Sequence, residues 1–393
     1  MTSVVHLHSN MAGAPVLNGT AGSLINVLDA CLVNGFNLRS VDSITVSSGI
    51  ATATVSAGHG FDVDTIVLIA GATPSGLNGR KRVLATSTTT FAFDATGVPD
   101  GTATGTISAR YAPAGWEKAF SGTNLAAYRS LDITGTRLYL RVNDTGTTDA
   151  RVVGYESMTD INTGVNLFPT NAQLSGGLFW PKATDTSATA RAWTVVGDGK
   201  TFYFWANTHT TSASFGVNGL TYGFGDILSY RPADAFGCFI AGARASVGNS
   251  ATAQATGIHR SNAIPVATND CAYLARSYLN VGGSIQAGRR AQFLATPDTS
   301  SGASLVAYPN GADNALLLSP ILVFDDNTQL RGQLPGVYFV PQNLGTTTFA
   351  WLQKVDGQGP LLNRKLLAIK GDAASSTTAT NVTLFFDITG PWS

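Results

Sequence analysis

Short runs of β-branched and aromatic residues that end in Asn-Gly or Asp-Gly pairs are the feature that most constrains this chain. Such pairs favour two-residue hairpin turns because both central residues adopt positive φ readily. The clearest predicted hairpin has its turn at Asp198-Gly199, between the runs Trp193–Val196 and Phe202–Trp205. Similar pairs recur along the chain at Asn78-Gly79, Asp100-Gly101, Asn218-Gly219 and Asn310-Gly311. We therefore expect a mainly β protein built from sandwich- or barrel-type domains.

One stretch, residues 22–34, has helical periodicity instead. Its apolar face is predicted to be buried, Thr20 or Ser23 can cap its start, and Asn34-Gly35 can end it. The last strand, Val382–Ile388, is also expected in the core, with Trp392 as an anchor for the end of the chain. The apolar face of the helix consists of Leu24, Ile25, Val27, Leu28, Cys31 and Leu32.

The 393 residues exceed the usual size of one domain. Residues 40–110 are read as a small inserted β module, a sandwich or a barrel, because turn signals recur there at short spacing. The host domain is then discontinuous, comprising 1–39 and 111–210, and 211–393 forms a C-terminal β domain. Insertions are tolerated at exposed loop tips, so this module is expected to project outward.

Charged residues make up only 12% of the chain, against roughly 25% in soluble globular domains. A surface with so little charge does little to keep a protein monomeric. We therefore expect an assembly component, either a homotrimer or a ring, whose surface is covered by neighbouring subunits. The 24 basic and 24 acidic residues cancel. The densest basic cluster, Arg80-Lys81-Arg82, is interpreted as a solvated hairpin end, so nucleic acid is not expected as a partner.

The cysteines and the N-terminus indicate where the chain is made. Cys31, Cys238 and Cys271 show no metal-ligand spacing and are interpreted as buried thiols of a reducing compartment, although a Cys238–Cys271 disulfide stays open. The N-terminus has no secretory signal pattern, and no apolar run has the length of a membrane span. We expect synthesis in the cytoplasm without membrane insertion, after which the protein stays soluble or leaves by cell lysis.

Three polar clusters are candidate metal sites. His6 and His8 share one face of a predicted strand and could form half of a metal site, or could simply be polar residues near a terminus. The loop Asp144–Asp149 and the triplet Asp325–Asn327 carry oxygens that suit calcium, but the same residues make ordinary turns. The simpler alternative is preferred in each case, so no metal and no cofactor is predicted.

Few patterns in the sequence indicate catalysis. Glu117 and Glu156 are the only glutamates, so a catalytic carboxylate pair would depend on aspartates. The sequence contains neither a nucleophile elbow nor a phosphate-binding loop. We predict no enzymatic activity.

Aromatic residues are the best candidates for binding. In Phe202–Trp205, strand alternation places Tyr203 and Trp205 on the face opposite to Phe202 and Phe204. One pair is core, and the other is the core of a second layer, a subunit interface or a ligand surface such as a sugar platform. The candidate interface or ligand aromatics are Tyr203, Trp205, Tyr222, Tyr230 and Trp392.

Several blocks of the sequence carry a resemblance. They are NGTAGSLINVLDACLVNGFN, GWEKAFSGTNLAAYRS, RLYLRVNDTGTTDARVVGYESMTDINTG, WTVVGDGKTFYFWA, FGDILSYRPADAFGCFIAG, RGQLPGVYFVPQ and NVTLFFDITGPWS. In this order they resemble virion structural proteins of tailed bacteriophages that are associated with the tail or baseplate. The segment 40–110 is similar to the small Ig-like or barrel-like β modules of phage tail and adhesin proteins. No catalytic residue carries over from this family.

The resemblance implies a non-enzymatic virion component, located at the baseplate or tail tip. It would bind other virion proteins through its subunit interfaces and project the 40–110 module. Two alternatives stay open: a receptor-binding tail protein that recognises a glycan or pilus on the host cell, and a capsid-decorating or head-fibre protein.

Overall fold

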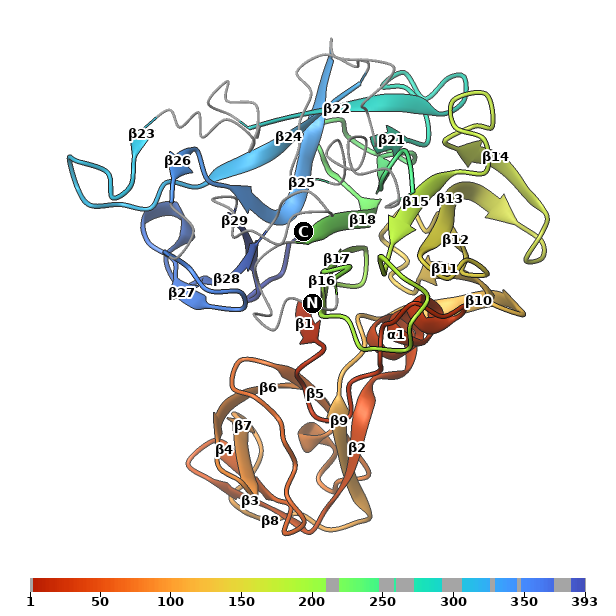
Figure 1. The fold of residues 1–393 in the computed structure, drawn as a ribbon. Coiled ribbons are helices and arrows are strands. Elements are labelled where there is room, and N and C mark those ends of the chain that lie inside the picture. The colour runs from red at the N-terminus through yellow and green to blue at the C-terminus, as the bar shows by residue number, and fades with distance from the viewer. Residues whose placement is uncertain are drawn as a thin grey trace.

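The computed structural model describes residues 3–209, 219–246, 258, 272–291, 306–325, 329–344, 348–370 and 383–392. Within these residues the chain is mainly β, with three large antiparallel sheets, a two-stranded parallel pair and one helical segment near the N-terminus (Figure 1). The predicted fold class is therefore confirmed. The parallel pair consists of β23 (Val306–Ala307) and β26 (Gln342–Asn343).

The first sheet is built from residues 36–111. Its strands, in spatial order, are β2 (Phe36–Val41), β9 (Ile107–Tyr111), β5 (Ile66–Ala70), β6 (Gly79–Thr86), β7 (Thr90–Asp94), β4 (Ile50–Thr54), β3 (Ser43–Ser47) and β8 (Gly101–Thr102). A short 3-10 turn, Ser75–Leu77, lies between β5 and β6.

This sheet closes on itself. The segments β2–β3 and β8–β9 pair with each other twice, β2 with β9 and β3 with β8. From there β9 pairs with β5, and β3 pairs with β4, so pairing continues around a ring. The residue pair Thr73–Thr104 adds a further bridge. We call residues 36–111 the barrel because the sheet closes. Closure leaves few strand edges free to pair with another chain.

The second sheet has six strands and covers residues 116–181. They are β10 (Trp116–Gly122), β11 (Leu125–Ser130), β12 (Tyr139–Asn143), β13 (Asp149–Met158), β14 (Gly164–Phe168) and β15 (Leu178–Pro181), the last pairing with β13.

The third sheet has thirteen strands and includes the N-terminal strand β1 (Val5–His8). The others, in chain order, are β16 (Trp193–Gly197), β17 (Thr201–Ala206), β18 (Leu220–Asp226), β19 (Leu228–Ser229), β20 (Cys238–Ala241), β21 (Ala272–Leu274), β22 (Ile285–Ala291), β24 (Ser319–Asp325), β25 (Gln329–Phe339), β27 (Lys354–Asp356), β28 (Lys365–Lys370) and β29 (Thr383–Asp387). A 3-10 turn, Gly359–Leu361, precedes β28. We call the second and third sheets, with the helix, the body.

The third sheet curls around a core of its own. Tyr203 on β17 donates a hydrogen bond to the carbonyl of Pro335 on β25, 2.8 Å away, and its ring packs on Phe386 of β29. The indole of Trp205 likewise donates to the Lys370 carbonyl at 2.6 Å. Early strands of the sheet therefore face late strands across a buried aromatic layer.

The opposite face of β17 and β18 packs on the six-stranded sheet. The Trp180 ring stacks on Tyr222 and on Phe204, with ring centres 5.7 and 5.9 Å apart. Trp116 meets Phe202 edge to face and donates to the Asp198 carbonyl at 2.9 Å. Both faces of β17 are thus core, as strand alternation predicts for a strand buried on two sides.

The helical segment has the predicted extent, but neither Thr20 nor Ser23 caps it: the cap position is Gly22, which has no side chain to accept a hydrogen bond. It comprises α1 (Ser23–Leu28), continued by a π-helical turn, Asp29–Asn34, and Gly35 ends it at a φ of 70°. Its apolar side chains are buried in the same core as the barrel and the six-stranded sheet. A Gly at a positive φ is a common helix terminator because it has no Cβ to clash.

The predicted boundary at 210/211 falls within the third sheet. Strands β17 and β18 lie on either side of it and pair along six residues each. In contrast, residues 36–111 form a sheet separate from the other two, and Figure 1 shows the barrel standing out from the body on two adjacent connections.

Candidate functional site

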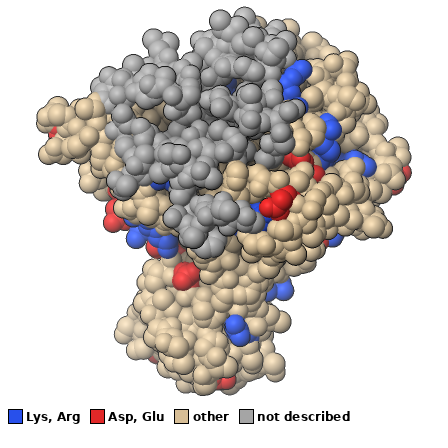
Figure 2. Space-filling model, in the orientation of Figure 1, with Lys and Arg blue, Asp and Glu red and all other residues tan. Residues whose placement is uncertain are grey.

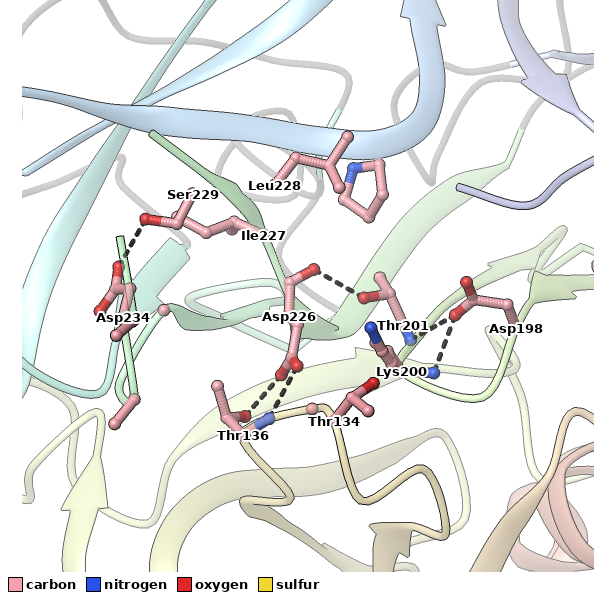
Figure 3. Close-up of a pocket in the computed structure, with 15 residues that line it drawn as sticks. Thr134, Thr136, Asp198, Lys200, Thr201, Asp226, Ile227, Leu228, Ser229 and Asp234 are labelled. Carbon is pink, nitrogen blue, oxygen red and sulfur yellow. Dashed lines mark hydrogen bonds between the residues drawn. The ribbon is translucent and has the colours of Figure 1, made fainter. Parts of the chain in front are cut away.

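The described residues contain a pocket of about 400 Å³ where the two body sheets meet (Figure 3). Four segments form it: the loop after β11, the β16–β17 turn with the start of β17, the segment from the end of β18 to Gly237, and Pro335 of β25. The polar residues on its wall are Thr134, Thr136, Asp198, Lys200, Thr201, Asp226, Ser229 and Asp234.

Asp226 ties the two sheets together inside this pocket. Its Oδ2 accepts a hydrogen bond from the Thr136 backbone N–H at 2.8 Å, and its Oδ1 accepts one from the Thr136 hydroxyl at 2.5 Å. Burial disfavours the charged carboxylate and raises the pKa of Asp226 to about 6, although the Thr136 hydrogen bonds act against the shift.

The other two carboxylates hold local structure. Asp198 Oδ1 accepts the N–H groups of Lys200 and Thr201 at 2.8 and 2.9 Å, which closes the β16–β17 turn. Burial raises the pKa of Asp198. Asp234 forms a two-pronged pair with Arg331, both contacts 2.8 Å. Burial alone would raise the pKa of Asp234, but the hydrogen bonds from Arg331 and Ser229 outweigh it and lower that pKa.

These contacts define what the pocket can do. Each carboxylate accepts hydrogen bonds that fix a turn, a loop or an arginine, so the observed geometry is that of a joint between sheets. In the part of the chain that the structure describes, no group of three or more His, Cys, Asp or Glu side chains is placed to hold a metal ion.

The aromatic candidates separate into buried and exposed residues. Tyr203, Trp205, Tyr222 and Trp392 are buried inside the chain, where they form the two aromatic layers of the body. Only Tyr230, next to the pocket residue Ser229, is strongly exposed, at 54%. A side chain packed in the chain's own core cannot also face a ligand or another subunit. Of these five candidates, Tyr230 therefore remains as a residue that can lie at an interface or a ligand surface.

The barrel meets the body through charged groups. Arg82 Nη2 on β6 donates to the carbonyls of Ile388 and Thr389, each 2.9 Å away. Lys354 of β27 reaches the Val63 carbonyl at 2.5 Å and the Asp64 carboxylate at 3.3 Å. We call this set the barrel junction. Figure 2 shows basic and acidic side chains gathered at the waist between barrel and body, while most of the barrel face in view is uncharged.

The junction corrects one interpretation from the sequence. Arg80-Lys81-Arg82 is not a solvated hairpin end: Arg82 joins the barrel to the C-terminal segment, and Arg80 donates to the Pro113 carbonyl, which lies just after the barrel. The cluster itself was visible in the sequence. Its carbonyl partners were not, because acceptors of this kind carry no residue-type signal.

His6 and His8 lie beside the junction. His6 is 2% exposed, and its Nδ1 and that of His8 have no hydrogen-bond partner in the described structure. Burial lowers the pKa of His6, helped by the charges of Lys354, His8 and Arg82. Burial and Lys354 lower the pKa of His8 to about 4. The positive charges that act on His6 (Lys354 and Arg82) and on His8 (Lys354) disfavour a cation beside these rings, so the structure gives the metal half-site alternative no support.

The remaining candidates have structural partners. Asp144, at the start of the loop considered for calcium, is fully buried and bonded to Lys182 and to backbone N–H groups. Asp325 accepts a hydrogen bond from the Tyr278 backbone, and the rest of its triplet lies outside the described residues. Cys31 and Cys238 are buried free thiols, and Cys271 lies outside the described residues.

Among the described residues, no helix has the length and apolar character that a membrane span requires.

Comparisons with known proteins give few matches. No family model matches the sequence, and no curated protein matches it. Among solved structures, the chain is similar to "Phage phi92 endosialidase" at 13% sequence identity and a TM-score of 0.16, over 90% of this chain and 52% of that chain. The chain therefore spans about half the length of that protein.

Proposed function

We propose that the protein is a non-enzymatic structural component of a tailed-phage virion, located at the baseplate or tail tip, that presents the barrel outward. The observation that carries this proposal is the barrel itself, which stands clear of the body yet is fixed to it by the barrel junction (Figure 1). A module held at a set orientation suits display or docking. The resemblance of the sequence blocks to phage virion proteins supports the same reading.

Surface chemistry supports an assembled state. Charged residues are scarce, and exposed apolar side chains lie on both the barrel, such as Leu38 at 66%, and the body, such as Ile133 at 82%. Scattered apolar residues are normal on a protein surface, but low charge lowers the cost of covering that surface. We propose contacts with other virion proteins and a homo-oligomer, either a trimer or a ring. Mass photometry of the purified chain tests the oligomeric part.

The location is tested by immunogold labelling of intact particles, with antibodies raised against residues 36–111. Label at the tail end is the expected result. Label over the head would instead indicate capsid decoration, and particles that stay unlabelled while a tail-protein antibody binds would contradict the virion role. Host-cell binding by the purified protein separates a receptor-binding role from a purely structural one, because only the former requires affinity for a cell-surface glycan or pilus.

A further inference from the structure

Lys182 and Asp144 are in direct contact in the interior of the body. Asp144 follows β12, and Lys182 follows β15. Both side chains are 0% exposed, and the lysine Nζ donates to Asp144 Oδ1. Nζ also donates to the Thr20 carbonyl at 2.6 Å, which holds the amine in place.

The second oxygen of Asp144 lies in a different environment. Oδ2 accepts hydrogen bonds from the backbone N–H groups of Leu24 and Ile25, at 2.8 and 3.2 Å. Two N–H groups aimed at one carbonyl-type oxygen are the arrangement that stabilises an oxyanion during acyl transfer. The carboxyl group therefore presents one oxygen to an amine and the other to oxyanion-stabilising donors.

Burial also favours the neutral forms of both partners. Burial raises the pKa of Asp144, against the opposing effects of Lys182 and the Ile25 and Leu24 amides. Burial lowers the pKa of Lys182, although the negative charges of Asp144 and Asp149 act in the other direction. The Tyr128 phenol is a further titratable group close to Asp144, and its own pKa is raised, mainly by burial. Forming a neutral amine beside a neutral acid therefore costs less free energy here than it does in water.

We propose that Lys182 Nζ and Asp144 Cγ join in an intramolecular amide bond, with release of one water molecule. This inference goes beyond the proposed function and does not depend on it.

The chemistry balances without another reactant. A proton first passes from Nζ to Asp144 Oδ1, which leaves a neutral amine and a neutral acid. The amine lone pair then attacks Cγ, and the carbonyl electron pair moves to Oδ2, where the Leu24 and Ile25 amides hold it. A second proton passes from Nζ to Oδ1. The Cγ–Oδ1 bond breaks, water departs, and Oδ2 re-forms the carbonyl of the amide.

The product would be a covalent clamp across the six-stranded sheet. It would connect the end of β12 to the end of β15 and would keep the Asp144 contact with α1. A cross-link of this kind restricts the unfolded chain as a disulfide does, and it resists reduction.

Intact-mass spectrometry of the denatured protein tests the proposal. The expected mass is lower than the sequence mass by one water molecule. Trypsin should then yield one branched peptide that joins residues 142–151 to residues 152–191, because an acylated Lys182 is no longer cleaved. A full sequence mass, together with cleavage after Lys182, would overturn the proposal. So would a water loss confined to one unbranched peptide, which indicates succinimide formation.

Two variants make the assignment specific. Lys182→Met should have its full calculated mass, because the nucleophile is gone. Lys370→Met is the matched control: Lys370 is also a buried lysine, but its Nζ lies 3.3 Å from the Thr383 hydroxyl. It should keep the deficit of one water. A deficit that persists in Lys182→Met would contradict the assignment even if that variant folds poorly, since the mass is read on denatured protein.

Discussion

Arg82 of the barrel and Thr389 near the C-terminus are joined by a hydrogen bond of 2.9 Å, although 307 positions separate them in the chain. The same guanidinium holds the Ile388 carbonyl and, through Nη1, the Asp64 carbonyl at 3.0 Å. Arginine suits this role because its fork presents several donors in fixed directions. One side chain thereby connects the barrel to the segment that directly follows β29, the last described strand of the body.

Replacing Arg82 with Met should loosen the barrel without unfolding it. Hydrogen bonds from charged donors contribute about 1.5–3 kcal/mol each in favourable settings, so we expect a loss of roughly 1–3 kcal/mol in unfolding free energy. Small-angle scattering should show a broader distribution of barrel positions. Lys81→Met is the control, because Lys81 bonds to Gly76 within the barrel. Equal scattering profiles for wild type and Arg82→Met would refute a fixing role.

Much of the fold could be predicted from local patterns. The helix, the Asp198-Gly199 hairpin and the two faces of Phe202–Trp205 follow from periodicity and turn chemistry, which act over a few residues. The anchoring of Trp392 was also predicted, and its indole donates to the Asp387 carbonyl at 2.8 Å. These features need no knowledge of distant segments.

The rest depends on contacts between distant segments. Alternation showed that Tyr203 and Trp205 share a face, but not that the third sheet curls until Pro335 and Lys370 meet them. The pocket was missed for the same reason, since Asp226 and Thr136 come from different sheets. A single sequence records which residues can pair, and it does not record which partner they find.

Substitution of Gly336 by Ala should destabilise the C-terminal end of the body. Gly336 has a φ of 65°, and an added Cβ would overlap the Trp392 indole ring. We expect a loss of about 2–4 kcal/mol, combining backbone strain with displacement of a buried aromatic side chain. Gly311→Ala is the control, because a Cβ there meets open space and should change the unfolding free energy by less than about 0.5 kcal/mol. Similar midpoints in urea for both variants would contradict this packing.

Acid should lower the unfolding free energy of the protein through the two histidines of β1. The folded-state pKa values of His6 and His8 lie below the ordinary value, so the unfolded chain binds more protons as the pH falls through 6.5. The stability that they contribute is complete above pH 6.5 and is lost toward pH 4, the value for His8. Replacing His8 with Gln should remove about 2–3 kcal/mol of this acid-induced loss. Urea titrations of both proteins at pH 7 and pH 4 measure the difference, and parallel losses would refute it.

Asp226 should show the opposite pH dependence. Its folded-state pKa is raised from 3.8 to about 6, so the folded protein holds the proton more tightly than the unfolded chain does. The stabilising effect of this proton is complete below pH 3.8 and is lost as the pH rises through 6. Asp226→Asn stays neutral at every pH, and its amide can still accept from the Thr136 N–H and donate to the Thr136 hydroxyl. The unfolding free energy of the variant should therefore exceed that of the wild type at pH 8 by up to about 2–3 kcal/mol and match it near pH 3.5.

Asp132→Asn is the contrasting variant. Hydrogen bonds from Thr134 lower the pKa of Asp132, so this substitution should reduce the unfolding free energy at pH 8. If Asp226→Asn is instead less stable than wild type at pH 8, the carboxylate is needed in its charged form, and the burial argument for the pocket is wrong.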